Sequence, residues 1–222
     1  MNFIQRLNRL FYRPSGGLIP DWRIRYLVER YGMIEPFYPL KERYRRDADG
    51  DIVFSLNDGS PAPIISRGLG HYSYDLTLSP KEFLVFRNTP GTVVDPKDFN
   101  PTCLGPATLH SDRKGSFFIL PAHTYALGFT VEYQRIPDNV TVVYIGKSTY
   151  ARTGVIVNTT PGEAGWEGHL TIEISNSSGA DVRIYVNEGI CAALFFEGVQ
   201  SNTTYGRGKY QGQGAGVVFA KV

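Results

Sequence analysis

Short strand-like runs, each bounded by turn residues, fill the chain from about residue 64 onwards and constrain its fold more than any other feature. In residues 169–174, HLTIEI, apolar and polar side chains alternate, which puts Leu170, Ile172 and Ile174 on one face of a strand. No long helical pattern separates the runs, and 24 glycines and 14 prolines supply the turns. The sequence therefore predicts a mostly-β fold, either a β-sandwich, a jelly roll or a distorted barrel. The expected strands are 74–78, 83–86, 116–120, 125–133, 140–145, 154–158, 170–175, 182–186 and 191–197.

The two ends of the chain differ in sequence pattern from this β region. Asp21 is a good N-cap and Gly32 a good helix stop, so a short helix is expected between them. Residues 3–12 could form a second, basic amphipathic helix, and residues 40–59 are charged and rich in turn residues. We therefore expect three parts: a helical N-terminal extension over 1–60, a β domain over 61–200 and a mobile C-terminal arm over 201–222.

Charge and cysteine content narrow the class of protein. With 23 Lys and Arg against 21 Asp and Glu, the net charge is +2, which gives no electrostatic reason to expect a nucleic-acid or membrane-surface binder. No run of about 18 apolar residues is present to span a bilayer. The two cysteines, Cys103 and Cys191, are far apart and form no CxxC motif. We expect a cytoplasmic protein with two incidental thiols.

Several kinds of catalytic centre lack their motifs in this sequence. Zinc deaminases need a triad of His and Cys ligands, usually seen as HxE with PCxxC. The four histidines are not paired at metal-ligand spacing, so no zinc site and no other protein-held metal are expected; they are His71, His110, His123 and His169. GxSxG, HExxH, Walker A and dinucleotide-binding motifs are also absent.

One dense polar segment remains, from Gly146 to Glu173. Lys147 and Arg152 flank two hydroxyl residues after an apolar run, a pattern that could hold a phosphate chain or could be an ordinary strand-to-helix turn with solvated charges. Glu173 sits between two isoleucines, where partial burial would raise its pKa and suit it to general acid–base catalysis. A solvated, outward-facing glutamate would fit the same pattern. The residues alone leave both pairs of interpretations open.

The block GKSTYARTGVIVNTTPGEAGWEGHLTIEISN, residues 146–176, resembles the signature region of the dCTP deaminases, trimeric enzymes of the dUTPase-like superfamily. Similar stretches occur on both sides of it, at 92–101, 124–140, 184–198 and 208–217. The resemblance implies a distorted jelly-roll or dUTPase-like β-barrel subunit and a homotrimer with active sites shared between chains. It also implies zinc-independent hydrolysis of dCTP to dUTP and ammonia, with Mg²⁺ held through the triphosphate.

The resemblance also assigns roles to residues of this chain. Glu173 matches the catalytic general acid and base, and Ser148 and Arg152 match the residues that position the attacking water and organise the pocket. The remaining substrate-binding positions comprise Lys147 and Thr149 in the phosphate-binding segment, Glu163 beside the deoxyribose, Thr171 and Ile172 at the base edge, and Tyr205, Lys209 and Gln213 in the segment that closes over the triphosphate.

Two departures from the family pattern bear on the substrate. Thr77 stands where the family commonly has an arginine, and Ala192 where close relatives carry a glutamine. The alternatives are therefore a bifunctional dCTP deaminase/dUTPase, a dUTPase that releases dUMP and pyrophosphate, or a deaminase of another deoxycytidine nucleotide, either a monophosphate or one with a modified base. A non-catalytic nucleotide-binding regulator is a further alternative.

Overall fold

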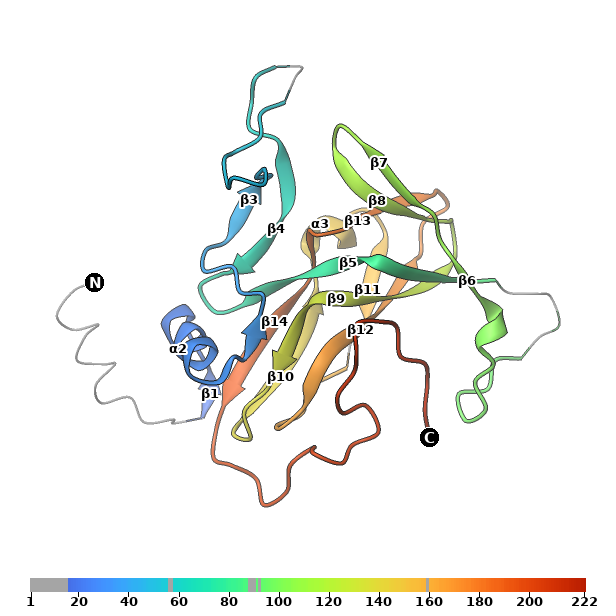
Figure 1. The fold of residues 1–222 in the computed structure, drawn as a ribbon. Helices are drawn as coiled ribbons and strands as arrows, with labels where there is room; N and C mark the ends of the chain where they lie inside the picture. The colour runs from blue at the N-terminus through green and yellow to red at the C-terminus, as the bar shows by residue number, and fades with distance from the viewer. Residues whose placement is uncertain (1–15, 56–57, 88–90, 92, 159) are drawn as a thin grey trace.

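The computed structural model describes residues 16–222 except 56–57, 88–90, 92 and 159 (Figure 1). The mostly-β prediction is confirmed, since strands make up most of the regular structure and the longest helix is α2 (Asp21–Tyr31). Within the described residues, no helix is long and apolar enough to cross a membrane.

The main sheet is strongly curled and carries the order β1-β14-β5-β9-β12-β11. Its main-path strands are β1 (Gly17–Leu18), β14 (Gly189–Glu197), β5 (Tyr74–Phe86), β9 (Tyr125–Arg135), β12 (Glu167–Asn176) and β11 (Val155–Asn158). Further strands join this sheet at its sides: β2 (Ile34–Glu35), β3 (Glu42–Tyr44), β4 (Pro63–Leu69), β6 (Leu104–Pro106) and β10 (Val140–Gly146). A second, three-stranded sheet has the order β13-β8-β7, with β13 at Val182–Tyr185, β8 at Gly115–Leu120 and β7 at Leu109–Asp112.

All strand pairs are antiparallel, and the curled sheet encloses an apolar core. Tyr74, Phe83 and Phe195 are among its largest fully buried side chains. The core also contains Ile24 and Leu27 of α2, so the N-terminal helix packs onto the β domain.

The helix expected between Asp21 and Gly32 is present, and Gly32 ends it in the left-handed conformation with φ 62°. Asp21 is its first helical residue rather than its N-cap, because the cap position is taken by Pro20. The Asp21 amide is satisfied by the carbonyl of His71, at 2.8 Å, so a side-chain cap is not needed there. The second helix predicted for residues 3–12 lies outside the described residues.

The charged segment 40–59 contains more pairing than a surface loop. Strand β3 pairs with β4, and two isolated bridges, Arg46 with Ile52 and Phe54 with Pro61, continue the ladder outwards. Figure 1 shows the resulting hairpin projecting beside the β7–β8 hairpin.

Candidate active site

Glu173 lies in the middle of β12, between β9 and β11. It is paired in register with Leu127 of β9 and Asn158 of β11. Its strand neighbours Ile172 and Ile174 are fully buried in the core, whereas Glu173 is half-buried. The predicted alternation therefore holds here and turns the Glu173 side chain away from the core.

The environment of the Glu173 carboxyl is poorly solvated. Its Oε2 atom is buried and has no hydrogen-bond partner in the described part of the chain. Burial raises the pKa of Glu173 to about 7, because the charged form loses hydration and a hydrogen bond from the main-chain amide of Glu173 offsets only part of this loss. The Glu173 charge in turn contributes to raising the pKa of Tyr125 on β9, although burial of that phenol is the larger cause. A carboxyl with a pKa near neutrality can both accept and return a proton.

Glu173 opens into a cavity of about 460 Å³ between β12 and the C-terminal tail. Six of the residues predicted from sequence to act at the site line this cavity: Glu163, Thr171, Glu173, Tyr205, Lys209 and Gln213. Apolar side chains complete the wall, among them Phe86, Phe99, Leu127, Leu170 and Val218. A cavity of this size, with few polar groups among apolar ones, is typical of small-molecule sites.

The C-terminal tail is held against β12 by main-chain contacts. Gln213 forms a parallel bridge with Gly168, and its carbonyl accepts from the amide of His169 at 2.9 Å. Gly168 has φ 147°, and a β-carbon there would lie 2.8 Å from the nitrogen of Gln213. Glycine is therefore required at this position for the tail to approach β12 so closely.

Side-chain contacts continue the attachment of the tail. The indole of Trp166 donates to the carbonyl of Tyr210 at 2.8 Å, and the amide of Val218 donates to Thr171 Oγ1 at 3.2 Å. Lys209 is exposed, and its ammonium group donates to the carbonyl of Lys221 at 2.7 Å. In this arrangement the tail forms one wall of the cavity.

Ile172 occupies a different environment from the other predicted residues of β12. Its side chain is fully buried in the core and does not line the cavity. Any contact that it makes with a ligand must therefore come from its main chain.

The predicted alternation of side chains along β12 is broken on the N-terminal side of Thr171, where the register against β9 shifts between His169 and Thr171. At this bulge the hydroxyl of Thr130 accepts from the amide of Leu170, at 2.9 Å.

Ser148, Thr149 and Arg152 belong to α3 (Ser148–Ala151) and the residue after it, and none of them lines the cavity. All three side chains are exposed. The turn is anchored by Tyr150, whose buried hydroxyl accepts from the amide of Tyr185 at 2.8 Å. Within this chain, the structure therefore does not bring the three residues into the cavity that contains Glu173.

Exposed apolar side chains surround this turn. Val143 and Ile145 on β10 are 40% and 45% exposed, and Ile156 on β11 is 55% exposed. These β-branched residues lie on strands that enter and leave the α3 turn. Ser148 and Arg152, which are also exposed, lie on the turn between these two strands.

Lys147 is partly buried and ion-paired. Its ammonium nitrogen lies 2.6 Å from Asp75 Oδ2 and 3.1 Å from the hydroxyl of Ser66. The same carboxylate oxygen also binds Lys41, at 2.9 Å. Sequence reasoning assigned Lys147 to the phosphates and gave no sign of this pairing, because Asp75 lies on a distant strand.

Sequence reasoning also missed the aromatic side of the cavity. The rings of Phe86 and Phe99 meet edge-on, with centroids 6.2 Å apart, and Phe99 contacts Phe219 of the tail. These residues come from three separate segments, and nothing in their local sequence distinguishes them from ordinary core aromatics. The role of Phe86 and Phe99 as cavity wall follows only from the tertiary fold.

Metal binding by the protein itself has little support in the donor groups. Within residues 16–222, leaving aside the undescribed positions, no three His, Cys, Asp or Glu side chains are grouped to hold a metal ion. The carboxyls of Glu163 and Glu173 both line the cavity, where they would face a bound ligand and whatever cation it carries.

Comparison with known proteins identifies the family. The profile of the dCTP deaminase-like family matches residues 46–198. A protein of Granulibacter bethesdensis named dCTP deaminase is 45% identical over 200 residues, covering 89% of this chain and 95% of its own length. The chain belongs to the dCTP deaminase-like family. A relative of the same name from Acinetobacter baylyi is 43% identical over 204 residues, with coverage of 90% and 97%.

A solved structure supports the fold of this family member. The 2'-deoxycytidine 5'-triphosphate deaminase of Agrobacterium tumefaciens superposes with a TM-score of 0.50 at 14% identity. The match covers 83% of this chain, which spans about half of that protein's chain, 49%. At this level of identity the likeness bears on the fold alone.

Proposed function

We propose that the protein is a dCTP deaminase that hydrolyses dCTP to dUTP and ammonia. The observation that supports this most directly is the half-buried Glu173, with an unpartnered carboxylate oxygen, inside a cavity of about 460 Å³. Family membership and the names of relatives at 45% and 43% identity support the choice of dCTP as substrate.

In the proposed reaction, Glu173 acts as general base and then as general acid. It removes one proton from the attacking water as the water oxygen bonds to C4 of cytosine, and it delivers this proton to N3. It then takes the second proton from the new C4 hydroxyl and delivers it to the departing amino group. The C4–N4 bond breaks, ammonia leaves, and the ring becomes uracil without an external oxidant or reductant. The raised pKa of Glu173 suits a group that must hold a proton between these steps.

The other residues of the cavity are proposed to bind different parts of the nucleotide. Thr171 and Glu163 line the same cavity as Glu173. We propose that Thr171 and the main chain at Ile172 contact the base edge and that Glu163 contacts the sugar. Tyr205, Lys209 and Gln213 line the tail side and are proposed to hold the triphosphate. Magnesium would neutralise the phosphate oxygens and be held mainly by them and by water.

We further propose a homotrimer in which Ser148 and Arg152 of one chain complete the cavity of its neighbour. The exposure of both side chains and the apolar surface beside them support this arrangement. Arg152, Lys147 and Thr149 would then reach the phosphates from the second chain, and Ser148 would hold the attacking water. Light scattering should give about three times the chain mass of 24.8 kDa, and a mass near one chain would contradict the trimer.

Complementation tests the shared site. Ser148→Ala and Glu173→Gln chains should each be nearly inactive alone. When they are co-expressed and mixed randomly in trimers, about a quarter of the sites would receive both wild-type groups, because these come from two adjacent chains. Recovery of about a quarter of wild-type activity is the expected result. If the mixture stays as inactive as its components, the two residues do not act across a subunit boundary.

A single product assay separates the alternative reactions. The protein is incubated with dCTP and Mg²⁺, and dCTP, dUTP and dUMP are resolved by chromatography. Accumulation of dUTP is expected for a deaminase, dUMP from dCTP would show a bifunctional enzyme, and dUMP from added dUTP alone would show a dUTPase. Parallel reactions with dCMP and base-modified cytosine nucleotides test which substrate the protein prefers. If the protein converts none of these nucleotides, the remaining interpretation is a non-catalytic nucleotide-binding regulator.

A further inference from the structure

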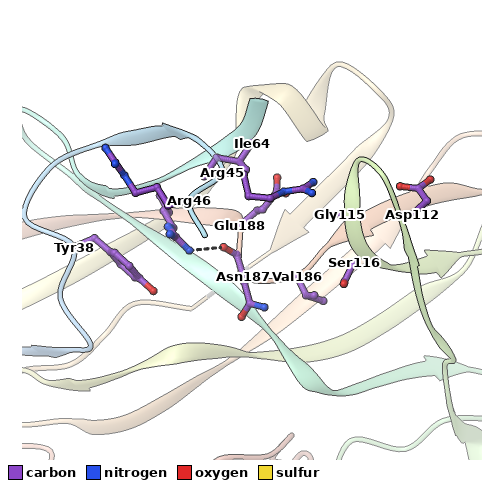
Figure 2. Close-up of a pocket in the computed structure, with 11 residues that line it drawn as sticks. Tyr38, Arg45, Arg46, Ile64, Asp112, Gly115, Ser116, Val186, Asn187 and Glu188 are labelled. Carbon is purple, nitrogen blue, oxygen red and sulfur yellow. Dashed lines mark hydrogen bonds between the residues drawn. The ribbon is translucent and has the colours of Figure 1, made fainter. Parts of the chain in front are cut away.

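A second cavity, of about 420 Å³, lies between the hairpin of β3 and β4 and the hairpin of β7 and β8. Three arginines are among its lining residues, and Figure 2 shows two of them, Arg45 and Arg46, with Glu188 nearby. None of the residues assigned above to the active site lines it, and its lining includes Arg45, Arg46, Arg67, Asp112, Gly115 and Glu188. Tyr38 and Arg45 precede the part of the chain that the family profile matches, residues 46–198.

The arginines of this cavity outnumber the carboxylates that bind them. Arg67 and Arg46 share Glu42, at 2.8 Å and 3.4 Å respectively. Asp112 is already paired with Arg183 at 2.6 Å, so it offers little charge to the cavity. The lining holds three arginines against two carboxylates, Asp112 and Glu188, so the cavity wall carries a net positive charge.

Arg45 has the least satisfied guanidinium of the three. One of its nitrogens, Nη1, donates to the carbonyl of Arg113 at 3.3 Å. The other, Nη2, is buried and has no hydrogen-bond partner among the described residues. Buried guanidinium donors are ordinarily paired, because leaving one unpaired forfeits the hydration it had in water.

Glu188 faces Arg45 beside Gly115. A β-carbon on Gly115 would lie 3.2 Å from Arg45 Nη2 and 3.4 Å from Glu188 Oε1. The other carboxylate oxygen, Oε2, accepts from the amide of Ile65 at 2.7 Å. Arg45 and Glu188 do not form an ion pair with each other among the described residues. Their side chains therefore line the same space, and no direct contact between them fills it.

We propose that this cavity binds a phosphate ester that also carries a hydrogen-bond donor, which is the chemistry of a nucleotide. The phosphate oxygens accept from Arg45 Nη2, and a sugar hydroxyl or base amine donates to Glu188 Oε1. Arginine is suited to phosphate because its planar fork presents several donors at once. Since this cavity and that of Glu173 have no lining residue in common, a ligand here would act as an effector rather than as substrate.

Calorimetric titration tests the proposal with inorganic phosphate, pyrophosphate and the common nucleoside mono- and triphosphates as probes. The titrations use the Glu173→Gln chain with one equivalent of dCTP per chain, so that the proposed active site is filled without turnover and without excess dCTP to occupy the arginine-lined cavity. If dCTP does not bind this chain, the proposed function fails, and titration without dCTP still reports on the arginine-lined cavity. Nucleotides that bind more tightly than inorganic phosphate would show that the rest of the molecule is recognised too.

Two variants and a control locate the binding. Arg45→Gln removes the unpaired donor, and Gly115→Ala keeps every charge but puts a methyl group into the space between Arg45 and Glu188. Because Gly115 has φ 134°, where a side chain also strains the backbone, the melting temperature of Gly115→Ala is measured beside its affinity. Arg43→Gln, on the exposed surface of β3, makes the same change in net charge outside the cavity. We expect at least about a tenfold loss of affinity in the first two variants and none in the third.

Three results would overturn the proposal. The first is that none of the probes binds beyond the dCTP site. The second is that Arg45→Gln and Gly115→Ala bind the probes as tightly as Arg43→Gln does. The third is a change in oligomeric mass caused by Arg45→Gln, which would show that a neighbouring chain, rather than a small ligand, occupies the cavity.

Discussion

The ammonium nitrogen of Lys147 lies 2.6 Å from Asp75 Oδ2, the oxygen that also binds Lys41 at 2.9 Å. Asp75 is 1% exposed, so one buried carboxylate holds two cations from separate segments of the chain. Lys147 comes directly before the α3 turn, and the ion pair therefore fixes where that turn leaves β10. An ammonium group has three donors, and Asp75 and Ser66 take two of them from Lys147.

The first prediction separates the two roles that this geometry gives Lys147. Lys147→Met should lower the melting temperature, since a buried carboxylate loses a partner, and it should raise the KM for dCTP, since the third donor is proposed to reach phosphate. Lys41→Met removes the other cation from the same oxygen and is the matched control. It should lower the melting temperature and leave KM unchanged. Equal KM effects in both variants would mean that Lys147 acts only through Asp75.

The second prediction concerns the attachment of the tail. Gly168→Ala forces a β-carbon to within 2.8 Å of the Gln213 nitrogen and should displace the tail from β12. Loss of tail contacts to the triphosphate should raise KM by about tenfold or more, because each charge-assisted hydrogen bond contributes about 1.5–3 kcal/mol. Gly214→Ala is the control, since its β-carbon would meet nothing within 4 Å. If the two variants show the same KM as wild type, the tail does not hold the nucleotide.

The third prediction concerns stability and pH. Glu132 on β9 is fully buried and accepts hydrogen bonds from the amide and hydroxyl of Thr77, at 2.9 Å and 3.0 Å. Burial raises its pKa to about 7, from about 4.3 in an unfolded chain. The folded state therefore binds this proton more tightly, and the resulting stabilisation is present below about pH 4 and lost as the pH rises to about 7.

Urea unfolding at about pH 5 and about pH 8 should show lower stability at the higher pH, with a contribution from Glu132 on the order of 3 kcal/mol. Glu132→Gln should reduce this pH dependence without abolishing it, because burial also raises the pKa of Glu173 and Glu188 to about 7. Glu29→Gln, at an exposed helix position, should leave it unchanged. An unaltered pH dependence in Glu132→Gln would contradict the prediction.

Local patterns predicted many of the strands because period-two alternation depends on neighbouring residues only. The burial of Ile172 and Ile174 on either side of Glu173 is an example. Local patterns did not predict that 74–78 and 83–86 form one continuous strand, β5 (Tyr74–Phe86), or that β4, β6 and β7 are present. The bulge between His169 and Thr171 was not predictable in this way, because it depends on hydrogen bonds to Thr130 across the sheet. A change of register is a property of two strands, and one strand's sequence does not contain it.

The candidate site was predictable in part. Family resemblance pointed to Glu163, Glu173 and Gln213, which the fold brings to one cavity from a loop, a strand and the tail. The contact between Phe86 and Phe99 and the ion pair between Lys147 and Asp75 were not predicted from the sequence, because each joins residues from separate segments of the chain. The separation of Ser148 from this cavity agrees with a site shared between chains, which a single chain cannot display.

The last prediction tests the proposed chemistry at Glu173. A general base must be deprotonated to accept the proton of water, and the pKa of this carboxyl is about 7. Activity at subsaturating dCTP should therefore rise as the pH increases through about 7 and fall away below it. Glu173→Gln keeps the size of the side chain and its hydrogen-bonding capacity but cannot carry a proton between water and cytosine.

In Glu173→Gln, kcat should fall by at least about 10²-fold, the lower end of what general acid–base groups contribute. The Kd for dCTP should change much less, because the proposed grip on the phosphates comes from the tail and from Arg152 of the neighbouring chain. Glu167→Gln, on the same strand but outside the cavity, makes the same chemical change and should behave like wild type. A purified Glu173→Gln chain that deaminates dCTP within a few-fold of the wild-type rate would exclude Glu173 as the proton carrier. A loss of dCTP binding as large as the loss of kcat would instead show that the carboxyl serves to hold the substrate.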